Sequence, residues 1–390
     1  MESQRLGDYI VCNPSVKLKK GQQCQLTDID SITIGQKYPI SKGLVIYDGQ
    51  SGSKFSKGDT IMARITPCLE NGKIAMYNGE EDSIGSTELF VFRGKEGVST
   101  NEFVYYFFKQ DWIRNYAANS MTGASGRQRA DIKFIQKAKV QFPPLATQQK
   151  VASILSAYDS QIENNQKRIK LLEQMAENLY KEWFVRFRFP DYENAEFEGG
   201  VPMGWRCGKL KNIAQDSGKS EKKDNRDKYP AYVPIDCISS HSMVLGSMDS
   251  IENAESSLVS FKKTDILFGA MRPYFHKVIM APFSGLTRST CFVISPKNES
   301  YRYFLYLLLF QKSSIDYATT ICVGSTMPYT VWKDFSRMPI VIPTENIVIR
   351  FAKLVKPIID SIESIYFSNN YLVKQRNLLL PRLMSGKLSI

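Results

Sequence analysis

The chain lacks most of the motifs on which enzyme active sites are commonly built. It contains no Gly-x-x-x-x-Gly-Lys-Ser/Thr phosphate loop and no Gly-x-Gly-x-x-Gly dinucleotide turn. Only two histidines occur, His241 and His276, too few for a histidine metal site or a histidine acid–base mechanism in both halves of the chain. These absences argue against nucleotide-driven and zinc enzymes, so we expect neither a catalytic residue nor a metal site.

Paired cysteines and long apolar runs are also missing. The seven cysteines are scattered without a Cys-x-x-Cys pair, which is typical of reduced thiols in a cytoplasm. The longest apolar run, from Tyr303 to Phe310, is too short to span a membrane. The first residues have no apolar core and do not resemble a secretory signal. We therefore expect a cytoplasmic protein with no membrane partner.

Acidic residues are fewer than basic ones. The 390 residues include 51 Lys and Arg against 39 Asp and Glu, a net charge of +12. Such an excess favours a polyanionic partner, either nucleic acid or an anionic membrane surface. The length exceeds what one compact core normally holds, so two or more domains are expected. In a cytoplasmic protein these features favour nucleic acid.

What the sequence does contain is two long heptad patterns in the same phase, 200 residues apart. A seam sustained over nearly five heptads is typical of a long helix that packs along a partner helix. Single heptad runs are common in core helices, so a chance match of two runs is the alternative. The predicted seam residues are Val151, Leu155, Tyr158, Ile162, Asn165, Ile169, Leu172, Leu179, Trp183, Phe351, Val355, Ile358, Ile362, Ile365, Asn369, Leu372, Leu379 and Leu383.

Prolines and a threonine mark the expected ends of these helices. Thr147 is placed to cap the first helix, which should continue to Pro190. Pro357 and Pro381 fall inside the second heptad run, and a proline removes an internal hydrogen bond. We expect the second helix to kink or restart near Pro357 and to end near Leu380.

We expect the two helices to pack antiparallel about a pseudo-twofold axis. In that arrangement the centres of the two seams, residues 167 and 367, lie beside each other. This pairing places Val151 near Leu383, Phe351 near Trp183, and Asn165 beside Asn369. A polar residue in an apolar seam fixes the register, because a slipped partner would bury an unpaired amide; the alternative is that both asparagines are exposed at a frayed seam. At ~1.5 Å per residue the rod measures roughly 48 Å, on the order of 14 base pairs.

The segment before each helix is repeated. Phe55-Ser-Lys-Gly-Asp59 matches Phe261-Lys-Lys-Thr-Asp265, and Ile65-Thr-Pro67 matches Met271-Arg-Pro273. Short β-branched or aromatic runs and one helical stretch, 101–119, predict a mixed α/β domain. The predicted fold is α+β, with two similar mixed α/β domains joined by two long antiparallel coiled-coil helices in a pseudo-twofold repeat. The predicted segments are 1–145 (first domain), 146–190 (central helix), 191–343 (linker and second domain) and 344–390 (C-terminal helix).

Three stretches of the sequence are specific enough to identify a family: the helix end 171–184, the tail 378–388 and Val201-Pro-Met-Gly-Trp205. With these stretches the chain resembles a specificity subunit of a type I restriction–modification system over essentially all its residues. The family's Pro-Pro-Leu stands at Pro143-Pro144-Leu145, but the second copy has Pro343-Thr344-Glu345, and the first copy lacks the Pro-x-Gly-Trp opening. The match to the family holds despite both departures.

The resemblance implies a non-catalytic subunit within a larger assembly. Each globular domain is expected to be a target-recognition domain for one half of a split double-stranded DNA site. The helices are expected to set the gap and to dock two modification subunits that bind S-adenosylmethionine and methylate adenine. A restriction subunit would use ATP and Mg for translocation and cleavage, so no cofactor is expected in this chain.

Candidate DNA-binding residues come from loops in both repeats. Phosphates are bound by Lys and Arg, while base edges are read by forked or amide groups such as those of Arg, Gln and Asn. The two repeats carry different side chains in these loops, which is expected if they read different sequences; ordinary solvated loops are the alternative. The candidates are Arg64, Thr66, Asn71, Lys73, Arg127, Gln128, Arg129, Lys219, Lys222, Arg272, Tyr274, His276, Lys277, Ser325, Thr326 and Tyr329.

Two other functions remain open from the residues alone. One is a basic coiled-coil scaffold or non-specific nucleic-acid adaptor, which would show no preference between specific and random duplexes. The other is an enzyme of unrecognised type, which methylation by the purified chain alone would establish.

Overall fold

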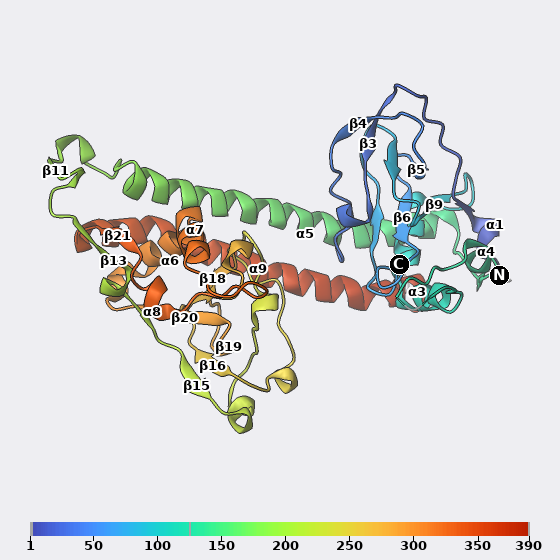
Figure 1. The fold of residues 1–390 in the computed structure, drawn as a ribbon. Coiled ribbons are helices and arrows are strands. Elements are labelled where there is room, and N and C mark those ends of the chain that lie inside the picture. Colours follow the sequence, from blue (N-terminus) through green and yellow to red (C-terminus); the bar gives the residue numbers. More distant parts are fainter. Residues whose placement is uncertain (1–2, 125, 389–390) are drawn as a thin grey trace. The chain divides into compact units, whose positions relative to one another are not determined.

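The computed structural model describes residues 3–124 and 126–388, so Ser125, in the basic loop, lies outside the described residues. The chain divides into two compact units, one of Met1–Asn164 with Asn369–Ile390 and one of Asn165–Ser368 (Figure 1). Each long helix contributes a segment to each unit. None of the helices in the described part of the chain combines the length and apolar character that a membrane span needs.

The described part of the first unit is built on two four-stranded sheets. The first sheet has the strand order β2-β9-β6-β7 and is antiparallel, while the second has the order β4-β3-β8-β5 and includes one parallel pair, β3 with β8. A short pair, β1 with β10, closes the domain. The elements are β1 (Gln4–Arg5), α1 (Leu6–Tyr9), β2 (Ile10–Cys12), β3 (Gln23–Leu26), η1 (Ile29–Ser31), β4 (Leu44–Ile46), β5 (Ser53–Phe55), β6 (Thr60–Ala63), β7 (Ile74–Met76), β8 (Ser83–Gly85), β9 (Leu89–Gly94), α2 (Asn101–Lys109), α3 (Asp111–Ala118), α4 (Ile132–Gln136) and β10 (Lys139–Val140).

The second unit repeats this arrangement, which confirms the predicted internal repeat. Its main sheet has the order β14-β20-β17-β18, a second sheet has the order β15-β16-β19, and β13 pairs with β21 as β1 does with β10. The strands are β11 (Phe197–Glu198), β12 (Val201–Pro202), β13 (Arg206–Lys209), β14 (Ala214–Asp216), β15 (Lys219–Glu221), β16 (Leu258–Phe261), β17 (Ile266–Gly269), β18 (Val278–Met280), β19 (Gly285–Arg288), β20 (Cys291–Pro296) and β21 (Pro339–Ile342). The helices are α6 (Arg302–Phe310), α7 (Lys312–Thr320) and α8 (Trp332–Phe335), with short turns η3 (Tyr192–Asn194), η4 (Leu210–Asn212), η5 (Lys223–Lys228), η6 (Ile235–Cys237), η7 (Ile251–Asn253), η8 (Pro273–Phe275) and η9 (Glu299–Tyr301).

The repeated Phe-x-x-x-Asp motif forms the same turn in both units. The Asp59 carboxylate accepts the backbone N–H of Ser56 at 2.8 Å, and that of Asp265 accepts the N–H of Lys262 at 2.8 Å. The residue before each aspartate has a left-handed backbone, with φ of +90° at Gly58. The motif therefore fixes the turn that leads into β6 or β17, the strands that carry the candidate loops.

Helices α2 and α6 are apolar on every side and lie at the centre of their units. Residues 103–108 of α2 and 304–310 of α6 are buried without interruption. One side of α2 faces the sheet, where the Phe108 ring stacks on Phe92 with centroids 3.8 Å apart. Its other side faces the long helix α5, where the Tyr106 hydroxyl donates to Asp159 at 2.6 Å. A helix that is apolar all round is stable only when covered on all sides, so α2 joins the sheet to the long helices.

The long helices are α5 (Leu145–Tyr180), which continues as a π-helical turn η2 (Lys181–Val185), and α9 (Glu345–Met384). In the first unit Val151 of α5 shares a core with Leu383 of α9. In the second unit the ring centroids of Trp183 and Phe351 are 5.4 Å apart. Within each unit the two segments therefore run antiparallel, as the centred seams predict.

Most of the predicted seam is buried. Tyr158, Leu172, Leu179, Leu372 and Leu379 are half-buried, and the other predicted positions are buried. Asn165 and Asn369 are only 3% and 9% exposed, so they are not frayed surface residues.

Three predicted helix ends are wrong. The first helix begins at Leu145, which places Thr147 inside the first turn, where its N–H donates to the Pro144 carbonyl at 2.9 Å. It ends near residue 185 rather than at Pro190, because the π-helical turn buries consecutive aromatic side chains and residue 187 then adopts a left-handed φ of +57°. The second helix continues through Pro357 without a restart and past Leu380 to Met384. Both of its internal prolines are exposed and each removes only one hydrogen bond, so seam packing keeps the helix intact.

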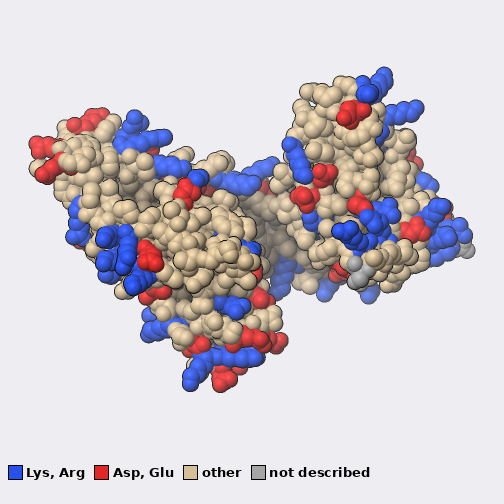
Figure 2. All heavy atoms as spheres, in the orientation of Figure 1, with Lys and Arg blue, Asp and Glu red and all other residues tan. Residues whose placement is uncertain are grey.

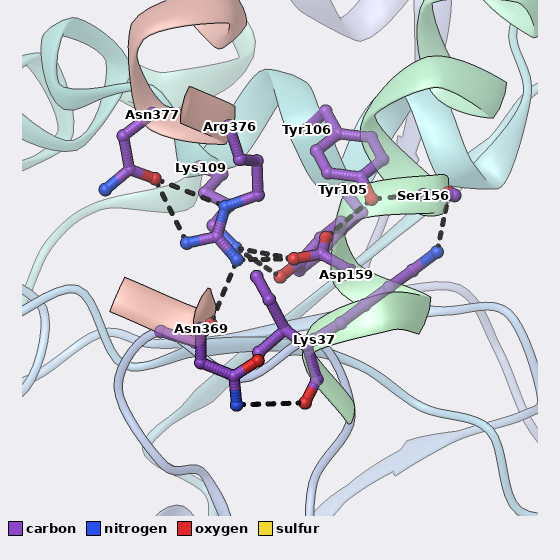
Figure 3. A network of polar contacts seen from close by, with 11 residues as sticks. Lys37, Tyr105, Tyr106, Lys109, Ser156, Asp159, Asn369, Arg376 and Asn377 are labelled. Carbon is purple, nitrogen blue, oxygen red and sulfur yellow. Dashed lines mark hydrogen bonds and ion pairs between the residues drawn. The ribbon is translucent and has the colours of Figure 1, made fainter. Parts of the chain in front are cut away.

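A buried ion pair replaces apolar packing at one place in the first unit. Arg376 of α9, 2% exposed, pairs with Asp159 of α5, 5% exposed, and also donates to the Gly35 carbonyl at 3.3 Å. Figure 3 shows the Arg376 guanidinium and the Tyr106 hydroxyl directed at the Asp159 carboxylate. The Lys109 ammonium lies 3.9 Å from the same carboxylate. The pair thus joins both long helices and α2.

Several cations lie close to Asp159. Burial lowers the pKa of Lys109 to about 8, although Asp159 opposes that shift and the nearby Arg376 and Lys37 add to it. Lys37 is itself held by a hydrogen bond to the Ser156 hydroxyl at 2.9 Å. Asp159 therefore faces several cations, and Glu102 and Glu163 also interact with Lys37.

In the second unit the positions 200 residues from Asp159 and Arg376 are Ile359 and Ala176, both buried and apolar. The positions that form an ion pair in the first unit are thus occupied by core apolar side chains in the second. Replacing a buried pair by well-packed apolar groups is often neutral, whereas removing one partner leaves an uncompensated buried charge.

We expect Arg376→Met to destabilise the first unit by about 3 kcal/mol, because Asp159 would keep only the neutral Tyr106 hydroxyl and a more distant lysine as partners. Hydrogen–deuterium exchange of the α2 amides measures this, since it reports on the first unit separately from the second. Arg382→Met, an exposed arginine on the same helix, is the matched control and should change exchange by less than about 0.5 kcal/mol. Equal protection in both variants would contradict a structural role for the pair.

Candidate nucleic-acid interface

Two loops that are distant in sequence form one surface in the first unit. The loop after β6 and the basic loop before α4 are joined by the Thr66 N–H, which donates to the Gln128 carbonyl at 3.0 Å. The Ala130 N–H donates to the Arg64 carbonyl at 2.9 Å. The structure therefore brings together two sets of candidates that the sequence placed about sixty residues apart.

Two of the three polar candidates in the basic loop reach the surface as charged side chains. Arg127 and Arg129 are exposed, while Gln128 is half-buried. The Arg129 guanidinium binds Glu88 through Nε at 2.8 Å and Nη2 at 2.6 Å. These hydrogen bonds lower the pKa of Glu88, so the pair stays charged under ordinary conditions. Arg129 is thus oriented by a carboxylate, and Arg127 is the more accessible cation for a phosphate or a base edge.

The loop after β6 contributes fewer accessible groups than the sequence predicts. Asn71 is exposed, but the Arg64 guanidinium lies over the Phe90 ring, 5.0 Å from its centroid. The Lys73 ammonium donates to the Ile29 carbonyl at 3.1 Å. Arg64 and Lys73 therefore hold the loop in place, and a direct contact of theirs with DNA stays a prediction.

The second unit builds the same backbone frame. The Arg272 N–H donates to the Pro328 carbonyl at 2.7 Å, and the Thr330 N–H donates to the Ala270 carbonyl at 3.0 Å. Met271 bridges Tyr329 as Ile65 bridges Arg129. The frame is therefore conserved between the repeats of this chain while the side chains on it change.

One lysine anchors the frame in both units. The Lys277 ammonium donates to the Ile235 carbonyl at 2.8 Å, which repeats the contact of Lys73 with Ile29. His276 is 8% exposed and lies against His241 and Phe310, and burial lowers its pKa. These positions weigh against direct DNA contact for Lys277 and His276.

The remaining candidates of the second unit are accessible. Tyr274 and Tyr329 are each 47% exposed, and Ser325 and Thr326 lie exposed in the second loop. The half-buried Arg272 guanidinium donates to the Thr326 carbonyl at 3.3 Å, which ties the two loops together. This surface is thus more aromatic and less charged than its counterpart in the first unit.

Lys219 and Lys222 are exposed in a third region, at and after β15. Figure 2 shows lysine and arginine interspersed with acidic residues at this end of the second unit. Lys223 pairs with Glu255 at 3.2 Å, for example. The mixture of charges favours an ordinary solvated surface, so the role of both lysines in phosphate binding stays a prediction.

Sequence reasoning missed three exposed apolar residues of these loops, Phe275, Val323 and Met327. It also missed the carboxylate that orients Arg129. The apolar residues lie within two positions of Pro273, Gly324 or Pro328, residues typical of turns. The sequence could have identified them, because large apolar side chains in surface turns are often exposed at binding sites. The partner of Arg129 is far away in sequence and had none.

Comparisons with known proteins agree with this repeated architecture. The family model for the Type I restriction modification DNA specificity domain matches residues 1–174 and 202–367, one match for each repeat. A crystal structure of a type I restriction–modification system S subunit from M. genitalium has the same fold, with a TM-score of 0.57 at 13% identity, covering 98% of this chain and 95% of that one.

Two curated proteins are similar along most of the chain. The type I restriction enzyme MjaIX specificity subunit of Methanocaldococcus jannaschii is 28% identical over 313 residues, 76% of this chain and 71% of that protein. The HindI specificity subunit of Haemophilus influenzae is 24% identical and covers 87% of this chain and 88% of its own length. The chain therefore belongs to the type I restriction–modification specificity subunits, a family that is not itself catalytic.

Proposed function

We propose that the chain recognises a bipartite double-stranded DNA site, with each globular domain binding one half. The observation that carries this proposal is the shared loop frame with different side chains in the two units. A fixed backbone can present different donors, acceptors and apolar groups to base edges, which is how one fold reads two sequences. A protein that binds DNA without sequence preference would not require two loop pairs with the same backbone and different side chains.

In the first domain, Arg127 and Gln128 are the proposed readers, with Arg129 oriented beside them by Glu88. Arginine and glutamine can both form paired hydrogen bonds with purine edges in the major groove. The net charge of +12 supplies the sequence-independent attraction to phosphate that brings the duplex to these loops.

The long helices are the proposed docking surface for two methyltransferase subunits. Both helices expose large apolar residues, including Leu171 and Met175 on α5 and Tyr371 and Leu378 on α9, with exposed fractions between 52% and 65%. Spacings of four and seven residues place each pair on one helix face, as a partner would require. S-adenosylmethionine would bind to those subunits, and ATP with Mg to a restriction subunit, so adenine methylation and cleavage would occur outside this chain.

Exchange of residues 207–342 for the same segment of a relative should change one half of the methylated site and leave the other half unchanged. The segment is suitable because its two ends lie side by side, with Cys207 opposite Val341 in the β13–β21 pair. Methylome sequencing of cells that carry the hybrid measures both half-sites at once. Exchange of residues 1–145 is the matched experiment for the other half, and a change in both halves from one exchange would contradict the proposal.

Arg127→Ala should weaken binding to the specific duplex by about tenfold, within the range for loss of one base or phosphate contact. The dependence of the affinity on salt separates the two roles. A phosphate contact lowers the salt slope by about 1 and affects all sequences alike, whereas a base contact relaxes the preference at one position. Lys139→Ala, an exposed cation on β10, is the control; equal effects of both variants would rule out a special role for Arg127.

The helices are also proposed to set the gap between the half-sites. Seven residues inserted between Asn164 and Asn165, together with seven between Ser368 and Asn369, keep the heptad phase and leave each unit intact. Each insertion adds roughly 10 Å, or about three base pairs. We expect methylome sequencing to show a longer gap with unchanged half-sites. A single insertion should instead weaken assembly, and an unchanged gap in the double insertion would disprove the ruler.

A further inference from the structure

The loops of the second unit carry a cluster of exposed apolar side chains. Tyr274, Phe275, Val323, Met327 and Tyr329 are between 45% and 57% exposed. We refer to these five residues as the apolar loop cluster. Large exposed apolar groups gathered at one place normally mark a binding surface, since scattered single residues need no such explanation.

The turn that carries two of the five residues has an unusual backbone. The turn that carries Tyr274 and Phe275 is flanked by Arg272 and His276, whose φ angles of +49° and +51° are left-handed values unusual for residues other than glycine. The His276 carbonyl accepts the N–H of His241 at 2.9 Å. A strained turn persists only when its surroundings fix it, and such turns concentrate at binding sites. The backbone that carries Tyr274 and Phe275 is therefore fixed by its surroundings.

The cluster borders a hollow of about 400 Å³. Its apolar lining consists of Ile235, Met271, Phe275 and Met327, and its polar lining of Asp236, Ser240, Arg272 and Lys277. Its apolar walls fit an apolar group of a partner, and Arg272 places a cation at the same hollow, while the Lys277 ammonium is already bound to a backbone carbonyl.

The position of the apolar loop cluster in the backbone frame indicates which group of the DNA packs against it. Tyr329 takes the place in the backbone frame that Arg129 has in the first unit. The first unit presents charged and amide groups here, whereas the second presents thioether and aromatic ones. In the major groove the one apolar feature of a base edge is the C5 methyl group of thymine.

We propose that the second domain recognises thymine methyl groups of its half-site, packed against Met327 and Phe275, with Arg272 at the edge of the contact. This inference rests on the proposed function, because it specifies how one of the two half-sites is read. The two domains then use different chemistry on one frame, with hydrogen bonds dominant in the first and methyl contacts in the second.

The test uses the full chain, co-expressed with the methyltransferase subunits proposed as its partners. A selection from random duplexes first gives the bound sequence. Each thymine of the half-site assigned to residues 207–342 by the exchange experiment is then replaced by deoxyuridine, which removes only the methyl group. We expect at least one position to lose affinity by about fourfold, the value for one buried methyl-sized group.

Met327→Ala and Phe275→Ala show whether the cluster is responsible. Each variant should bind the thymine duplex more weakly and should lose its sensitivity to deoxyuridine at one position, which a merely structural role would not produce. Met203→Ala is the matched control, because this methionine is 61% exposed in the same unit but lies outside both loops. It should retain the full sensitivity of the unchanged chain.

The outcomes separate this inference from the proposed function. Selection of no preferred duplex would overturn the proposed function and the inference with it. A preferred bipartite duplex that is insensitive to deoxyuridine, or whose sensitivity survives in both variants, would overturn the inference alone. Loss of the methyltransferase subunits from the Met327→Ala complex, with unchanged discrimination of thymine, would show a protein-docking surface and would likewise overturn it.

Discussion

The structure of each unit depends on the burial of one apolar helix between a sheet and the long helices. Residues 103–108 of α2 and 304–310 of α6 are buried side chain after side chain, so neither helix could be stable with a face in water. Because this helix contacts the sheet on one side and α5 or α9 on the other, it fixes the domain on the long helices. The sheet then positions the strands β6 and β17, which lead into one candidate loop of each unit; backbone hydrogen bonds join the second loop to the first.

The candidate loops are fixed by the backbone rather than by their side chains. The same pairs of N–H and carbonyl groups join the two loops in both units, and the same lysine contact anchors them. Side chains at the surface of such a frame are free to differ without cost to the fold. Arg129 and Tyr329 occupy equivalent positions in this frame. The two units therefore present chemically different surfaces on the same backbone arrangement.

The long helices also carry different side chains at matching positions in the two units. Asp159 and Arg376 form a buried ion pair in the first unit, while Ile359 and Ala176 occupy the matching positions in the second. A buried pair and an apolar contact can have similar net stability, because the attraction between charges is offset by their loss of hydration. The two solutions differ in their sensitivity to substitution. Loss of one partner of the ion pair leaves a buried charge without its counter-ion, whereas a smaller apolar side chain only reduces the packing.

The sequence by itself determined the repeat, the two antiparallel helices and most of their seam, because periodicity and duplication are properties of the order of residues. It did not determine where α5 ends or that α9 continues through Pro357, since packing on the seam decides both. It named Lys73, Lys277 and His276 as candidate DNA-binding residues, and only the tertiary structure revealed that their groups are bound or buried. Accessibility and long-range partners, such as Glu88 for Arg129 or Asp159 for Arg376, depend on which distant segments meet, and no local pattern encodes that.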